Sequence, residues 1–265
     1  MKKILPNKFI MTKHASEEDV YKFLRESLSL DDWYVNVFEL DKALNDNCLN
    51  NISKILNLEI MKYNGFNYVD FKDVYYENEF HFDGITSPNL SRAPKVLGFQ
   101  CLQNHTQVGG EMKLLNCEEI LKKLNKDVYK ILKNTVVNYY GMSSYFNKNP
   151  KFDELVFSIN PITTRNDSEY LRLHIPTQNK EMRKITKLGI YSFNDDYTCC
   201  LDKCSAEESI EIFDHLSEVS FHKDVTYKFK ILPYMFVLVN NNAVFHGRDK
   251  LLRPEKRLLR RIQFI

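Results

Sequence analysis

The sequence contains no run of 18 apolar residues, the minimum that a membrane-spanning helix requires. Its first apolar segment, Ile4-Leu5, is cut short by Pro6 and is too brief for the core of a secretion signal. We therefore predict no transmembrane helix, no association with a membrane and a cytoplasmic location.

A strong net charge is also missing. The 37 lysines and arginines are offset by 35 aspartates and glutamates, which leaves a formal charge of +2. Such a balance creates no field that would attract nucleic acid, and no basic stripe with interleaved aromatic residues is present. We expect a small-molecule substrate and no nucleic-acid partner, while the oligomeric state stays open.

Regular cysteine spacing is absent as well. The six cysteines form no disulfide framework, which indicates reduced thiols. Cys199, Cys200 and Cys204 lie close together but lack the paired C-x-x-C spacing of most structural zinc sites. We expect unpaired thiols there, with a structural metal site as the alternative.

Repeats, low-complexity tracts and linkers are missing too, so we predict one domain over residues 1–265. Apolar residues at helical spacing predict helices that begin at Ser16 and Ser205, both with a capping box, and others over 44–56 and 117–140. The polar segment 176–204 matches no pattern and is interpreted as a lid or a disordered loop.

Strand patterns dominate the last third of the chain. Residues 225–231 alternate between apolar and polar, and further strands are predicted over 234–239 and 257–265. Earlier strands are predicted over 33–38, 67–75, 96–102, 155–159 and 170–175, the last two as a pair around the turn at 165–168. The expected fold is mainly β with flanking helices, a sandwich or a jelly roll.

The segment His81-Phe82-Asp83 is the first candidate for chemistry. In an extended segment, residues i and i+2 point to the same side, so one metal ion can bind both side chains. A distant histidine would complete a site of two histidines and one carboxylate, which leaves coordination positions open. The motif is weak alone, because His222-Lys223-Asp224 matches it too. That second match lies in a charged turn with no array of histidine and arginine far downstream.

The carboxyl-terminal arginines favour the first motif. Arg257 and Arg261 follow His246 by 11 and 15 residues and share one face of the predicted strand. Two arginines that point into a β-barrel are costly unless they meet anions, and a dicarboxylate could bind there through paired hydrogen bonds. Arg260 lies on the opposite face, where we expect it to be solvated.

These segments together resemble one family. Phe80-His81-Phe82-Asp83-Gly84, the run from Asn241 to Arg248, and Arg257 with Arg261 are similar to the taurine dioxygenase/clavaminate synthase-like superfamily. Gly109-Gly110-Glu111 resembles its Gly-Gly turn, and Leu171-Arg172-Leu173-His174 its central hairpin. The resemblance implies a double-stranded β-helix, or jelly roll, with Fe(II), 2-oxoglutarate and O2 as cofactors.

The resemblance also implies residue roles. His81, Asp83 and His246 would bind Fe(II), Arg257 would pair with the distal carboxylate of 2-oxoglutarate, and Arg261 would contact the co-substrate or an anionic group of the substrate. Arg172 is a further possible substrate contact, with a structural or solvated role as the alternative. Met112 stands where the family often has a threonine that assists the co-substrate.

The expected reaction is hydroxylation, or a related oxidation, of an amino acid or an amino-acid-derived carboxylate in a biosynthetic pathway. Relatives that halogenate lack the carboxylate that Asp83 provides, which favours oxygenation. One alternative is a desaturase or oxidative decarboxylase of the same superfamily. Another is a non-catalytic jelly roll that only binds a metal or ligand, and Met112 is the residue that favours it.

Overall fold

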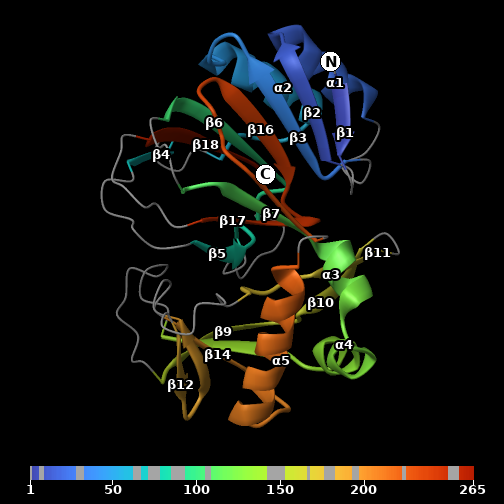
Figure 1. The fold of residues 1–265 in the computed structure, drawn as a ribbon, viewed down its shortest axis with the longest axis vertical. Coiled ribbons are helices and arrows are strands. Elements are labelled where there is room, and N and C mark those ends of the chain that lie inside the picture. Colours follow the sequence, from blue (N-terminus) through green and yellow to red (C-terminus); the bar gives the residue numbers. More distant parts are fainter. Residues whose placement is uncertain are drawn as a thin grey trace.

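The computed structural model describes residues 2–5, 9–27, 33–61, 67–70, 78–84, 93–104, 109–141, 153–165, 168–175, 183–192, 197–222, 225–249 and 257–265. It is a jelly roll in which two sheets face each other (Figure 1). The larger sheet has the order β1 (Lys2–Leu5), β2 (Phe9–Ala15), β3 (Val35–Leu40), β16 (Met235–Asn240), β6 (Val96–Asn104), β18 (Arg257–Phe264) and β4 (Asn67–Asp70). The smaller sheet has the order β15 (Thr226–Phe229), β7 (Met112–Asn116), β17 (Val244–Arg248) and β5 (Asn78–His81).

Apolar side chains at every second position of the strands fill the space between these sheets. Along β16, Val237 and Val239 pack toward the smaller sheet, while Phe236 and Leu238 pack on the other side. The smaller sheet contributes Leu114 and other apolar residues to the inner cluster. Alternation therefore separates a core between the sheets from a second core outside the larger sheet.

Two helices cover that outer side of the larger sheet, as Figure 1 shows. They are α1 (Glu17–Glu26) and α2 (Asp46–Leu56), and the capping box predicted at Ser16 is confirmed. Arg260 faces these helices: it is only 6% exposed, its Nη1 donates to the Leu44 carbonyl oxygen at 3.3 Å, and its Nη2 pairs with Asp46. The expectation that Arg260 is solvated was wrong, because α2 and not water covers the second face of β18.

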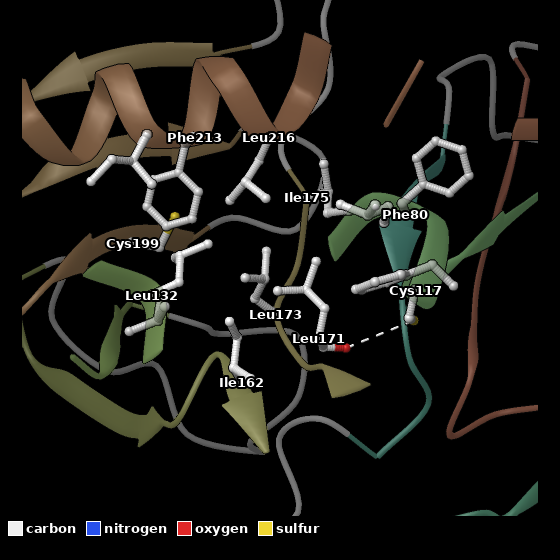
Figure 2. Packing of buried hydrophobic residues seen from close by; sticks show 14 of the residues in the cluster. Phe80, Cys117, Leu132, Ile162, Leu171, Leu173, Ile175, Cys199, Phe213 and Leu216 are labelled. Atoms are coloured by element: carbon white, nitrogen blue, oxygen red, sulfur yellow. Dashed lines mark hydrogen bonds between the residues drawn. The ribbon is translucent and has the colours of Figure 1, made fainter. Parts of the chain in front are cut away.

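A third layer lies beyond the smaller sheet. It contains α3 (Cys117–Lys123), α4 (Lys126–Lys133), α5 (Ala206–Ser220) and a sheet in the order β12 (Arg183–Thr186), β13 (Gly189–Ser192), β14 (Tyr197–Leu201), β8 (Val137–Tyr140) and β9 (Leu155–Ile159). A hairpin of β10 (Ile162–Arg165) and β11 (Ser168–Leu171) packs nearby. Figure 2 shows Phe213 and Leu216 of α5 packed with Cys199 and Leu171 in this core.

Three predictions for this layer were wrong. The helix predicted over 117–140 is two helices and a strand, because Leu124 ends α3 and residues 137–140 pair with β14 and β9. The strand pair predicted around 165–168 is β10 with β11, whereas β9 pairs with β8. The segment 176–204, interpreted as a lid or a disordered loop, contains the three strands β12, β13 and β14. Residues 176–182 and 193–196 lie outside the described part.

The remaining predicted elements lie close to their expected positions. The capping box at Ser205 opens α5, and β15, β16 and β18 account for the late strands. The described part of the strand predicted over 67–75 is β4, which ends at Asp70. None of the six cysteines forms a disulfide bond. Within the part of the chain that the structure describes, no helix is both long and apolar enough to cross a membrane.

Replacing Gly189 with alanine is expected to lower the free energy of unfolding by at least about 1–3 kcal/mol, the usual cost of a strained backbone conformation. Gly189 has φ +139°, and an added β-carbon would overlap the backbone oxygen of Cys199 on β14. Denaturant unfolding measures the change. The exposed neighbour Lys187, changed to alanine, should stay within about 0.5 kcal/mol of the wild type. Equal stabilities for the two variants would contradict the close approach of β13 to β14.

Candidate metal centre

Backbone pairing brings the two histidines together. His81 ends β5 and lies directly opposite His246 of β17 in the antiparallel ladder. Asp83 follows in a turn, where Gly84 has φ +74° and an added β-carbon would lie 2.9 Å from that of Ala93. The ligand atoms of His81, Asp83 and His246 all lie within 4.8 Å of one another.

The distances within this cluster fit a shared metal ion. Asp83 Oδ1 lies 3.8 Å from Nε2 of His81 and 3.5 Å from Nε2 of His246, both too long for good hydrogen bonds. When two ligand atoms each lie about 2.0–2.2 Å from the same first-row metal ion, their distance from each other is comparable to the two separations in this cluster. The donor set of two imidazoles and one carboxylate is also the one that Fe(II) oxygenases use.

Burial suits Asp83 and His246 for the binding of a metal ion. The side chains of Asp83 and His246 are only 3% and 6% exposed. Burial, followed by repulsion from His81 and His174, holds the pKa of His246 well below its ordinary value. His246 is therefore neutral near pH 7, the form whose nitrogen lone pair can bind a metal.

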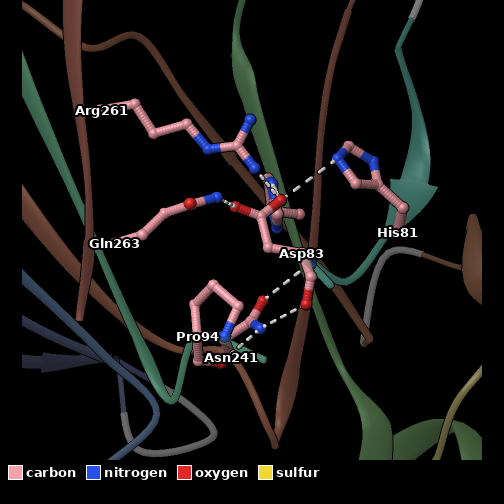
Figure 3. A network of polar contacts seen from close by, with 7 residues as sticks. His81, Asp83, Pro94, Asn241, Arg261 and Gln263 are labelled. Atoms are coloured by element: carbon pink, nitrogen blue, oxygen red, sulfur yellow. Dashed lines mark hydrogen bonds and ion pairs between the residues drawn. The ribbon is translucent and has the colours of Figure 1, made fainter. Parts of the chain in front are cut away.

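Both carboxylate oxygens of Asp83 have partners on β18, as Figure 3 shows. The guanidinium of Arg261 forms an ion pair with Oδ1, and Nε2 of Gln263 donates a hydrogen bond to Oδ2 at 2.7 Å. Burial lowers the pKa of Arg261 to about 10, so it stays protonated at neutral pH. Gln263 thus fixes one oxygen and leaves the other facing the two histidines and a positive charge.

The backbone of Asp83 is held as tightly as its side chain. Asn241, in the turn between β16 and β17, accepts a hydrogen bond from the Asp83 N–H at Oδ1, at 3.1 Å. Its Nδ2 donates to the carbonyl oxygens of Asp83 and Pro94, at 3.0 and 2.8 Å (Figure 3). Asn241 is 4% exposed. Its hydrogen bonds connect the turn that carries Asp83 to the strand that carries His246.

The sequence missed Gln263, Asn241 and the position of His174. Gln263 continues the i, i+2 series of Arg257 and Arg261, so the same face argument could have found it. His174 is a core residue that is 1% exposed, and its ring centroid lies 5.8 Å from that of His81.

The other candidate residues lie in different surroundings. Arg257 begins β18, in register with Asn104, and its side chain lies outside the part that the structure describes. Arg172 follows β11 and lines a separate pocket. Met112 is 4% exposed and packs in the core between the two sheets. His222 lies just past α5, and Asp224 is outside the described residues.

A jelly roll that gathers two histidines and a carboxylate at one buried point is typical of non-haem iron enzymes. A model of the family described as taurine catabolism dioxygenase TauD, TfdA family matches residues 61–263. The chain belongs to this family. It is a non-haem iron, 2-oxoglutarate-dependent dioxygenase, and Fe(II), 2-oxoglutarate and O2 are its cofactors.

Solved structures share the fold. The PvcB protein from Pseudomonas aeruginosa is 13% identical, with a TM-score of 0.70 over 99% of this chain and 87% of the other. A second PvcB structure is described as an Fe, alpha-ketoglutarate-dependent oxygenase from an isonitrile synthetic pathway. A taurine dioxygenase from Burkholderia xenovorans is 13% identical, with a TM-score of 0.67 over 99% of this chain and 88% of the other. No curated protein sequence matches this chain.

Proposed function

We propose that the enzyme hydroxylates, or oxidises in a related way, an amino acid or an amino-acid-derived carboxylate, with Fe(II) held by His81, Asp83 and His246. The observation that carries this proposal is the convergence of these three ligands with the partly buried guanidinium of Arg261. When bound, the iron couples the conversion of 2-oxoglutarate and O2 to succinate and CO2 with oxidation of the substrate.

The surrounding residues have defined tasks in this proposal. His81 and the neutral His246 offer imidazole nitrogens, and Asp83 offers a negative charge through Oδ1, the oxygen that Gln263 does not bind. Arg257 pairs with the distal carboxylate of 2-oxoglutarate, and Arg261 contacts the co-substrate or an anionic group of the substrate. The inner-face position of Arg261, two residues from the core residue Leu259, supports this assignment.

The substrate class rests on charge. An arginine that is 27% exposed and stays protonated beside the metal ligands favours a substrate or co-substrate that carries a carboxylate. PvcB, which shares the fold, is described as an oxygenase from an isonitrile synthetic pathway, and this supports a biosynthetic role for the chain. Desaturation or oxidative decarboxylation would use the same centre.

We further propose a single domain over residues 1–265, a cytoplasmic location and no nucleic-acid partner. The six cysteines without a disulfide bond support the cytoplasmic location, and the formal charge of +2 gives little attraction for nucleic acid.

The enzyme is expected to form succinate from 2-oxoglutarate when it is loaded with Fe(II) and given O2, and to form more with the true substrate present. Succinate is measured by mass spectrometry across a panel of amino acids and their N-acyl and carboxylate derivatives. His246→Ala should remove the signal, because it deletes a metal ligand. His222→Ala, taken from the other H-x-D motif, is the matched control and should keep it. Succinate formation that equals the His246→Ala background for every compound would refute the proposed reaction.

A further inference from the structure

A pocket of about 280 Å³ lies behind the turn that carries the metal ligands. Phe82, the residue between His81 and Asp83, forms one wall, while Thr163, Thr164 and Tyr170 of the β10–β11 hairpin form another. None of the three metal ligands is among the described residues that line it. The pocket is therefore distinct from the metal centre, although one segment borders both.

The polar groups of this pocket are matched to an anion. Arg172 supplies a cation, Thr163, Thr164 and Tyr170 supply hydroxyl groups, and Asn242 supplies an amide. No aspartate or glutamate is among its described lining residues. Hydroxyl and amide groups can all donate hydrogen bonds, so the lining offers one positive charge and several donors to a ligand.

Arg172 is a half-buried arginine. Among the described residues, no carboxylate forms an ion pair with its guanidinium. Burial lowers the pKa of Arg172. Its backbone N–H donates to the Pro161 carbonyl oxygen at 2.6 Å, which fixes the residue at the mouth of the hairpin. A desolvated cation held this way is costly unless an anion binds it.

We propose that this pocket is a second ligand site, which binds the oxyanion of a small molecule, a carboxylate or a tetrahedral anion, through Arg172. The guanidinium presents a flat fork of N–H groups that suits either oxyanion in two parallel hydrogen bonds. The volume lies just below the roughly 300–1,000 Å³ of pockets for drug-sized ligands, so the occupant is small. It would rest against Phe82, on the side of the turn away from Asp83.

The test is a calorimetric titration of the full-length protein with sodium sulfate and, separately, sodium acetate. Mn(II) is present, and 2-oxoglutarate is left out because its carboxylates could occupy the pocket. Binding that persists in Arg172→Gln is assigned to the metal centre and Arg261. Arg172→Gln should weaken binding of the preferred anion by about tenfold or more, since it deletes charge-assisted hydrogen bonds. Arg25→Gln, which changes an exposed arginine paired with Glu18, is the matched control and should bind as the wild type does.

Two further variants keep the result decisive. Thr163→Val keeps the shape and the charge of the pocket and should weaken binding by about two- to tenfold, even if Arg172→Gln proves unstable. The part of the binding that depends on Arg172 should persist in His246→Ala, whether or not this variant binds a metal, so failure of the metal assignment stays distinguishable. Anion binding that is absent in the wild type, or unchanged in both Arg172→Gln and Thr163→Val, would overturn the proposal.

Discussion

Replacing Asp83 with alanine is expected to lower the rate of succinate formation at least about a hundredfold, and the affinity for Mn(II) by a similar factor. Loss of partners outside the coordination sphere already costs about 10–100-fold in metal sites, and Asp83 is placed as a ligand itself. The two histidines alone offer no negative charge to the cation. Mn(II) affinity is measured from the electron paramagnetic resonance signal of the free ion, and succinate by mass spectrometry.

The same substitution should also destabilise the metal-free protein, by about 2 kcal/mol. Arg261 is 27% exposed, so the cost of leaving it without Asp83 lies between the values for surface pairs and buried pairs. The double variant Asp83→Ala/Arg261→Met removes both charges and should regain most of that stability while still failing to bind Mn(II). If the double variant regained metal binding along with stability, Asp83 would be a structural partner of Arg261 and not a ligand.

The sequence predicted those parts of the site that depend on local spacing. His81-x-Asp83 and the alternation of β18 are short-range patterns, and both place residues correctly on the inner face. The same alternation put Arg260 on the opposite face. It could not tell that α2, more than 200 residues earlier, covers that face, because such a contact leaves no periodic signal.

Long-range pairing also explains the other differences. Residues 137–140 continue the apolar spacing of a helix, yet they form a strand. Tyr139 pairs with Cys199 of β14, which lies 60 residues further along the chain. The polar composition of 183–201 hides three strands. β14 contributes Tyr197, Cys199 and Leu201 to the apolar core, but the polar residue Thr198 between them is buried as well. Asn241 contacts Asp83 across 158 residues, and no local pattern marks it.

Replacing Asn241 with leucine is expected to weaken Mn(II) binding by about 10–100-fold, as loss of a ligand's supporting hydrogen bonds usually does. Leucine has a similar shape but leaves the Asp83 N–H and the carbonyl oxygens of Asp83 and Pro94 without this partner. Each buried group left unsatisfied costs about 1–3 kcal/mol, so the loss of three partners should lower the free energy of unfolding by at least about 3 kcal/mol in total. Resonance titration and denaturant unfolding measure the two effects on the same preparation.

Asn241→Asp separates the contribution of each hydrogen bond. Its carboxylate can still accept from the Asp83 N–H, but it cannot donate to the carbonyl oxygens of Asp83 and Pro94. It should therefore bind Mn(II) no better than Asn241→Leu does, because two of three contacts become repulsive. Asn242→Ala, in the same turn, changes a half-buried neighbour that makes none of these contacts and should retain wild-type affinity.

Wild-type affinity in Asn241→Leu, with lowered stability, would mean that β5 and Gln263 alone hold Asp83 in place. Weak binding in Asn241→Leu, with wild-type binding in Asn242→Ala, would make the amide of Asn241 the element that couples the Asp83 turn to the strand of His246.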